Sequence, residues 1–310
     1  MAINSTPPQG IDVAYTGPVY EVNVNSPLLL AVNMTASGKG IYRLTVVDSK
    51  RRVRGVLSGL RILDLIAGRR GEGIKRRAGK GFEPFLRQPI HLFVSEYLHK
   101  LASNIPLKGV ISYIVENKVG HIVLVDQMNV LQGVITERCF LDRLPLKSFG
   151  INVSDLMTTQ VYTVTPAHSL ADAAIEMAAH GVRRLPILED KRLRGVITVT
   201  DILKHLISSE YHVEAVLSKK DMSKFMLTPV KTIHTTSPHS LSPTDDISEL
   251  LGLMKQGQDT GFPVVDPEGR LAGIVTSRDI VTKLPDAMGR DQFTQFISEN
   301  VKKGSTDRHV

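Results

Sequence analysis

The chain has 310 residues, of which 42% are hydrophobic and 22% charged, and its mean hydropathy is −0.01. No apolar run approaches the ~20 residues that span a bilayer, which argues against a membrane protein, and the first residues lack the basic and apolar regions of a signal peptide. We therefore expect a cytoplasmic protein. The single cysteine excludes an intrachain disulfide and a CxxC metal or redox site.

Positive charge is concentrated in one part of the chain. Lys and Arg total 38 against 31 Asp and Glu, a net charge of +7. Residues 39–80 contain thirteen basic and three acidic residues, so this window carries +10 and the remainder −3. A local positive field attracts a phosphate-bearing ligand, a nucleic acid or an acidic protein surface.

One short motif occurs four times along the chain. Glycine, two aliphatic residues and a hydroxyl residue appear as GVLS from 55, GVIT from 133, GVIT from 195 and GIVT from 273, at intervals of 78, 62 and 78 residues. Before each motif stands a β-branched run closed by an acidic turn, which predicts a hairpin. Helical periodicity precedes the hairpin, and a second helix follows the hydroxyl residue. The spacing predicts two pairs of a strand, helix, strand, strand, helix repeat.

The predicted organisation follows from these repeats. A unit of about 60 residues buries too little surface to be stable alone, so the repeats are expected to pair. In chain order we predict an N-terminal tail (1–15), repeat one (16–68), a basic Gly/Arg-rich loop (69–90), repeat two (91–146), repeat three (147–207), a linker (208–222), repeat four (223–286) and a C-terminal tail (287–310).

Repeat three, VSDLMTTQVYTVTPAHSLADAAIEMAAHGVRRLPILEDKRLRGVITVTDIL, resembles a cystathionine β-synthase (CBS) domain, and the other three fit the same pattern. A chain of four such units is similar to the γ subunit of the AMP-activated protein kinase and its stand-alone archaeal relatives. The resemblance implies an α/β fold of four β-α-β-β-α repeats, arranged as two tandem pairs that form a disc. It also implies AMP, ADP or ATP bound in clefts between paired repeats, no prosthetic group, and sensing rather than catalysis.

In repeats three and four the motif continues to an acid, at Asp201 and Asp279. A hydroxyl residue at a helix N-terminus favours an anion, and a carboxylate one turn later can accept hydrogen bonds from a ribose diol. The same spacing fits a capping box, in which hydroxyl and acid close the helix start. The acid is replaced by Arg61 in repeat one and Cys139 in repeat two, whereas the hydroxyl persists. Because capping serves every copy equally, this selective loss favours ligand binding in residues 147–286.

The resemblance implies further contacts. Arginines 183, 184 and 278 are placed for phosphates, which an arginine fork suits, although the first two also fit a solvated strand start. The segments that lead into repeats three and four, 158–163 and 228–232, are expected to hold adenine. The complete predicted site is Thr158, Val161, Thr163, Arg183, Arg184, Pro186, Thr198, Thr200, Asp201, Val230, Thr232, Thr276, Arg278 and Asp279.

The basic segment GRRGEGIKRRAGKG superficially resembles a P-loop. Five residues, not four, separate Gly73 from Gly79, and Gly81 follows Lys80 where Ser or Thr is needed. A loop over nucleotide phosphates, a docking surface for nucleic acid or an acidic partner, and a solvated loop all fit the segment. The absence of Trp and the low aromatic content, 5%, argue against a stacking platform for single strands.

The sequence favours a non-enzymatic adenine-nucleotide sensor, because four repeats leave no room for a catalytic domain. The alternative is a nucleic-acid-binding or scaffold protein that uses residues 39–80. The histidines show no metal-ligand spacing, and Cys139 is expected to be a buried, inert thiol. The expected partners are the nucleotide, a regulated protein and a second copy of the chain. The preferred nucleotide, the number of sites and the role of residues 69–80 stay open.

Overall fold

The computed structural model describes residues 16–37, 40–67, 82–94, 96, 98–207, 226–233, 235–236, 238–257 and 259–300. The predicted N-terminal tail, the basic segment 69–80 and the predicted linker lie outside these residues. None of the helices within the described ranges is long and apolar enough to cross a membrane.

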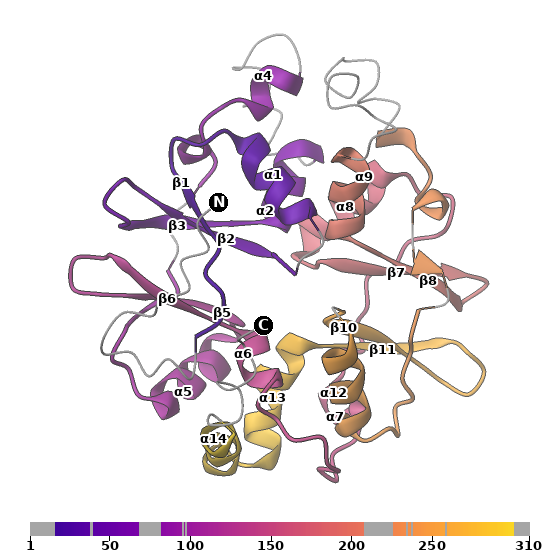
Figure 1. The fold of residues 1–310 in the computed structure, drawn as a ribbon. Coiled ribbons are helices and arrows are strands. Elements are labelled where there is room, and N and C mark those ends of the chain that lie inside the picture. The colour runs from indigo at the N-terminus through magenta and orange to yellow at the C-terminus, as the bar shows by residue number, and fades with distance from the viewer. Residues whose placement is uncertain are drawn as a thin grey trace.

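Repeats one and two carry all the predicted elements in the predicted order, and repeats three and four carry the helix, strand, strand and helix that follow the first strand (Figure 1). Repeat one comprises β1 (Glu21–Asn23), α1 (Leu28–Ala36), β2 (Arg43–Val47), β3 (Val53–Ser58) and α2 (Gly59–Ala67). Repeat two comprises β4 (Lys100–Ala102), α5 (Leu107–Asn117), β5 (His121–Val125), β6 (Leu131–Thr136) and α6 (Glu137–Leu141). Repeat three contains α8 (Leu170–His180), β7 (Arg184–Glu189), β8 (Arg192–Thr198) and α9 (Val199–Ile207). Repeat four contains α12 (Ile247–Gln256), β10 (Gly261–Val265), β11 (Leu271–Thr276) and α13 (Ser277–Met288).

The first strand differs between the two pairs. In repeats one and two, β1 and β4 run parallel to the first hairpin strand, β2 and β5 respectively. In repeats three and four the same place holds single parallel bridges, Val164 with Ile187 and Leu241 with Val264. The remaining elements are α4 (Phe82–Leu86), the 3-10 turns η2 (Ile90–Leu92) and η3 (Val230–Thr232), α7 (Val153–Leu156), β9 (Thr235–Thr236) and α14 (Arg290–Glu299).

The acidic turns of the sequence close the hairpins. Asp48 accepts hydrogen bonds from two backbone N–H groups of its turn, at 2.9 and 3.0 Å, and Asp126 and Asp266 accept backbone bonds at the same place in repeats two and four. Repeat three has a shorter turn, with Asp190 (φ 50°) and Lys191 (φ 63°) both left-handed. Two left-handed central residues are typical of the two-residue type I′ turn, which explains the shorter spacing in this copy.

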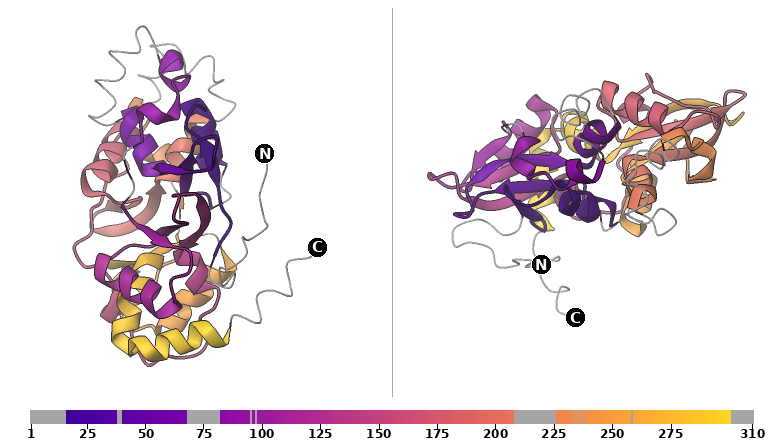
Figure 2. Two further views of the ribbon diagram at one scale, coloured as in Figure 1. Left: turned by 90° about the vertical axis from the view of Figure 1, so that its left-hand side faces the viewer. Right: turned by 90° about the horizontal axis from the view of Figure 1, so that it is seen from above.

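Strands join the repeats within each pair, and helices join the two pairs. The hairpin turns meet through isolated bridges, Arg52 with Val130 and Arg192 with Arg270. One apolar core combines the helices of repeats one and three, including α1, α2, α8 and α9. A second core combines repeats two and four, including α5, α12, α13 and α14. The four repeats therefore form a ring (Figure 1). The view from above shows that the ring is flattened, because its depth is smaller than its width (Figure 2).

Three segments pack across the predicted repeat boundaries. In α7, Val153 donates to the Asp245 carbonyl of repeat four (2.8 Å), although it was assigned to repeat three. Residues 226–233 lie on repeat three, where Leu170 donates to the Thr228 carbonyl (2.9 Å). In α4, Phe85 belongs to the core of repeats one and three, not to a loop. Each segment follows a predicted boundary that was drawn from chain order, whereas apolar burial decides where it packs.

Candidate functional site

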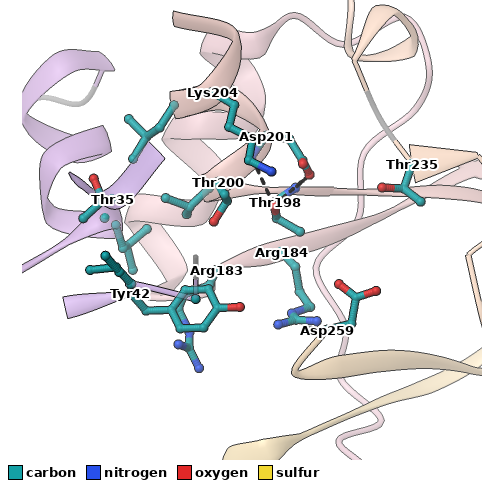
Figure 3. Close-up of a pocket in the computed structure, with 16 residues that line it drawn as sticks. Thr35, Tyr42, Arg183, Arg184, Thr198, Thr200, Asp201, Lys204, Thr235 and Asp259 are labelled. Atoms are coloured by element: carbon teal, nitrogen blue, oxygen red, sulfur yellow. Dashed lines mark hydrogen bonds between the residues drawn. The ribbon is translucent and has the colours of Figure 1, made fainter. Parts of the chain in front are cut away.

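A cavity of about 140 Å³ lies where repeats one and three meet. Figure 3 shows Arg183, Arg184, Thr198, Thr200 and Asp201 around it. We call it the Asp201 cavity. Its lining residues are Thr35, Gly40, Ile41, Tyr42, Gly59, Leu60, Arg183, Arg184, Thr198, Val199, Thr200, Asp201, Leu203, Lys204, Thr235 and Asp259.

The acid of this cavity is held by the helix start. Asp201 Oδ2 accepts hydrogen bonds from the backbone N–H (2.8 Å) and hydroxyl (2.7 Å) of Thr198, and the Thr198 hydroxyl accepts from the Asp201 N–H (3.2 Å). The capping box is thus formed, but it uses only Oδ2. Among the described residues Oδ1 has no hydrogen-bond partner, so capping and ligand binding are compatible here. Burial raises the pKa of Asp201, although the Thr198 bonds oppose this.

Two arginines come from the start of β7, but their surroundings differ. Arg184 donates through Nη2 to Thr260 Oγ1 (2.7 Å) and through Nη1 to the Gly261 carbonyl, so repeat four already holds it. Burial, followed by the nearby Arg183, lowers the pKa of Arg184 to about 10, which leaves it charged at neutral pH. The Arg183 guanidinium lies over the Tyr42 ring at 5.2 Å from the centroid. Both side chains line the cavity.

The corresponding acid of repeat four, Asp279, has different neighbours from those of Asp201. Asp279 Oδ2 accepts from the N–H (2.8 Å) and hydroxyl (2.6 Å) of Thr276. Its Oδ1 lies 2.7 Å from Lys283 Nζ and 3.4 Å from the Thr158 hydroxyl. Asp279 is only 8% exposed, and it lines neither the Asp201 cavity nor the central cavity described below. Arg278 points elsewhere, with Nε 3.8 Å from Glu137 Oε1.

The other predicted residues do not line the Asp201 cavity. Val230 is buried in the core of repeats one and three, and Thr232 is exposed. Pro186 is buried in β7, where its carbonyl accepts a hydrogen bond from the Val164 N–H. Val161 and Thr163, which precede Val164, are half-buried.

In the segment that leads into repeat four, the residue that lines the Asp201 cavity is Thr235. Thr235 pairs with Val196 one residue after the motif glycine, as Thr158 pairs with Ile274. Two consecutive threonines, at 158–159 and at 235–236, mark this position in the sequence. The predicted adenine segment TPVKT, 228–232, lies just before the second of these threonine pairs.

A larger cavity of about 340 Å³ lies between residues of all four repeats. We call it the central cavity. Gly40, Tyr42 and Arg183 line both cavities and therefore lie between them. The lining residues of the central cavity are Pro18, Tyr20, Gly40, Tyr42, Arg43, Thr45, Gly120, His121, Val134, Thr136, Glu137, Arg138, Leu141, Arg183, Gly257, Thr260 and Ser277.

Glu137 is a buried carboxylate at this centre, 8% exposed. Its Oε2 accepts from Ser277 Oγ (2.5 Å) and Arg183 Nη2 (3.4 Å). Burial opposes its ionisation, but Arg183 and Arg43, helped by the Ser277 bond, hold the pKa of Glu137 at about 2. The carboxylate is therefore charged at neutral pH. Burial and the nearby Arg43 lower the pKa of His121 to about 3, so its ring is neutral.

The remaining chemistry of the described residues is limited. No group of three or more His, Cys, Asp or Glu within them could hold a metal ion. Cys139 is 6% exposed, and burial raises the pKa of its thiol. Together the carboxylate, arginines and hydroxyls of the Asp201 cavity can bind a ligand that has both hydroxyl and anionic groups.

Comparison with known proteins agrees with this architecture. The family model of the CBS domain matches residues 153–208 and 230–286. Two segments of the chain, in repeats three and four, thus match the CBS domain. It is 26% identical over 297 residues to an uncharacterized 33.4 kDa protein in a ribosomal RNA operon of Thermofilum pendens, covering 93% of this chain and 95% of that protein.

The chain is also similar to protein MJ1225 of Methanocaldococcus jannaschii. The two sequences are 26% identical over 254 residues, or 80% of this chain and 89% of MJ1225. The crystal structure of MJ1225, which has been proposed as an archaeal homologue of g-AMPK, matches this fold with a TM-score of 0.79 and 24% identity. The match covers 87% of this chain and 98% of the MJ1225 chain. The predicted resemblance and the four-repeat α/β fold are confirmed.

Proposed function

We propose that the chain is a regulatory protein that binds an adenine nucleotide, AMP, ADP or ATP, in the Asp201 cavity. The observation that carries the proposal is that Asp201 lines one cavity together with Arg183 and Arg184, while the helix cap uses only its Oδ2. In this arrangement Asp201 accepts hydrogen bonds from the ribose diol. Arg183 and Arg184 bind phosphate. Thr235 lies where the leading segment of repeat four meets the adenine.

The four-repeat architecture supports a regulatory role without catalysis. The cavity is lined by repeats one and three, and repeat four adds Thr235 and Asp259. A bound nucleotide therefore contacts both pairs. It shifts their relative arrangement only if its affinity differs between the two arrangements, because equal affinity shifts nothing. The signal then passes to a regulated partner protein, in the cytoplasm.

The described part of the basic window offers less to nucleic acid. Arg51 pairs with Glu21 (2.8 Å), and Arg52 and Arg54 both pair with Asp48 (2.9 and 2.8 Å). These arginines of the β2–β3 hairpin are thus partly neutralised by acids, which reduces their attraction for a phosphate backbone. The contacts favour the nucleotide over nucleic acid as the ligand.

The proposal is tested by thermal unfolding of the protein with AMP, ADP, ATP and a short DNA duplex. A ligand at about one hundred times its Kd stabilises the folded state by about 2.7 kcal/mol. We expect this stabilisation from an adenine nucleotide in the wild type and its loss in Asp201→Asn. Stabilisation by DNA alone, or nucleotide stabilisation that survives in Asp201→Asn, would contradict the proposal.

Asp172→Asn provides the matched control. Asp172 Oδ2 accepts from the N–H (2.9 Å) and hydroxyl (2.7 Å) of Ser169, so it caps α8 as Asp201 caps α9. It is exposed and does not line the Asp201 cavity. Both substitutions remove a capping carboxylate, and only Asp201→Asn is expected to change nucleotide binding.

A further inference from the structure

Lys283 contacts the oxygen of Asp279 that corresponds to Asp201 Oδ1, the oxygen that the helix cap does not use. Its Nζ lies 2.7 Å from Asp279 Oδ1 and donates to the Leu156 carbonyl at 2.6 Å. The Thr158 hydroxyl is a third neighbour at 3.5 Å. An ammonium group has three N–H donors, so these neighbours can satisfy all of them.

This arrangement connects two parts of the chain that are distant in the sequence. Leu156 and Thr158 belong to the segment that leads into repeat three, whereas Asp279 and Lys283 belong to α13. The leading segment is also bonded to β11, because Thr158 donates to the Ile274 carbonyl (2.8 Å) and accepts from its N–H (2.9 Å). The ammonium therefore bridges the leading segment and the carboxylate.

The two helix starts otherwise match. Thr198 and Thr276 make the same hydrogen bonds to the acid three residues later. Lys283 follows Asp279 by four residues, and the same position after Asp201 is His205. In the described residues, hydrogen bonds to the Asp201 carboxylate come from Thr198 alone, and this carboxylate borders a cavity. Lys283 on α13, together with the Thr158 hydroxyl 3.4 Å from Asp279 Oδ1, thus accounts for the different surroundings of the two acids.

We propose that Lys283 takes the place of a ribose at Asp279, so that the second pair takes up one nucleotide, in the Asp201 cavity, and not two. The inference rests on the proposed function, and it assigns to Lys283 the number of ligands bound. A ribose hydroxyl must displace the ammonium to reach Asp279 Oδ1. The ammonium competes strongly because it is tethered to the same helix and its effective concentration is high. The ion pair is also partly shielded from water, which strengthens it.

Isothermal titration calorimetry with AMP counts the sites. Lys283→Met removes the ammonium and keeps an unbranched side chain, so we expect one additional AMP per chain relative to the wild type. The double variant Lys283→Met with Asp279→Asn is expected to return to the wild-type number. Lys283→Arg is the matched control, because a guanidinium retains the charge and the bridge, and it is expected to leave the number unchanged.

The reverse substitution gives an independent test. His205→Lys places a lysine four residues after Asp201, and we expect it to reduce the number of bound AMP molecules by one. This variant decides the question if Lys283→Met fails to fold, as judged by its melting temperature. Wild-type binding that disappears in Asp201→Asn, combined with an unchanged number in folded Lys283→Met, overturns the role of Lys283 alone. Absence of AMP binding in the wild type overturns the proposed function and this inference together.

Discussion

Arg183 and Glu137 form an ion pair between repeats three and two, with Nη2 of the arginine 3.4 Å from Oε2 of the carboxylate. Glu137 comes from the first residue of α6, and Arg183 directly precedes β7. Because Arg183 also borders the Asp201 cavity, a phosphate bound there as we propose would compete with Glu137 for the same guanidinium. This ion pair therefore links the Asp201 cavity to repeat two, which belongs to the other pair of repeats.

Substitution of Glu137 is expected to destabilise the fold. Glu137→Gln leaves Arg183 without its counter-charge in a buried site, and breaking a buried pair costs about 3 kcal/mol. Urea unfolding measures the change in the free energy of unfolding. Glu189→Gln is the control, because its pair with Arg194 (3.0 Å) is about half exposed on both sides, 53% and 50%. An exposed pair contributes at most about 1 kcal/mol, so equal losses in the two variants would contradict the prediction.

The same substitution is expected to change ligand preference. Glu137→Gln removes one negative charge from the place toward which additional phosphates would extend, so the affinity for ATP should rise more than that for adenosine. The ratio of the two Kd values, measured by calorimetry, reports the effect independently of folding stability. A ratio equal to that of the wild type would show that phosphates do not reach the Glu137 region.

Stability is expected to decline on acidification in two steps. His121 has an ordinary pKa of 6.5, lowered to about 3 by burial and Arg43 in the folded protein, so the unfolded state binds its proton first. Stability is therefore lost as the pH falls from 6.5 toward 3. Glu137, whose pKa falls from 4.5 to about 2, contributes stability that is lost between those values. The test is the free energy of unfolding measured from pH 7 to pH 3. In His121→Asn, its dependence on pH between 6.5 and 4.5 should be much weaker than in the wild type, and an unchanged dependence would contradict this assignment.

Nucleotide binding should weaken in acid because of Asp201. Burial raises its pKa above the ordinary value of 3.8, while Thr198 and Lys204 oppose the shift and Asp259 adds to it. Protonation removes the charged acceptor for the ribose diol, so the Kd should increase as the pH falls toward that raised pKa. Adenosine is the probe, since it carries no phosphate that titrates. Asp201→Asn should not show this pH dependence, and a flat wild-type profile would count against Asp201 as the ribose acceptor.

Two glycines with open space around them should respond in opposite directions to alanine. Gly181 ends α8 at φ 66°, and a Cβ there would meet no atom within 4 Å, so Gly181→Ala is destabilising through backbone strain alone, by about 1 kcal/mol. Gly252 lies inside α12, also with no atom within 4 Å of a Cβ. Gly252→Ala should stabilise by about 0.8 kcal/mol through helix propensity. Thermal unfolding of both variants tests the pair, and changes of the same sign would contradict it.

Features that depend on short-range geometry were predictable from the sequence. The order of helices and strands followed from periodicity, and Asp48 and Asp126 mark turns because an acid can accept backbone bonds two and four residues later. The hydroxyl and acid of Thr198 and Asp201 form the predicted contact because they lie on one helical turn. Each of these interactions is complete within a few residues, so local spacing determines it.

Only the tertiary structure decided which repeats share a core and what surrounds each acid. Tyr42 and Asp259 reach the Asp201 cavity from repeats one and four, and no local pattern specifies such meetings. Lys283 is one turn from Asp279, but its bond to the Leu156 carbonyl needs the leading segment of repeat three to pack on repeat four. Apolar burial sets these long-range positions, because helix faces of similar character can pair in several ways and the best-packed arrangement of the whole chain selects one. Two acids with equivalent sequence positions thereby acquire different surroundings.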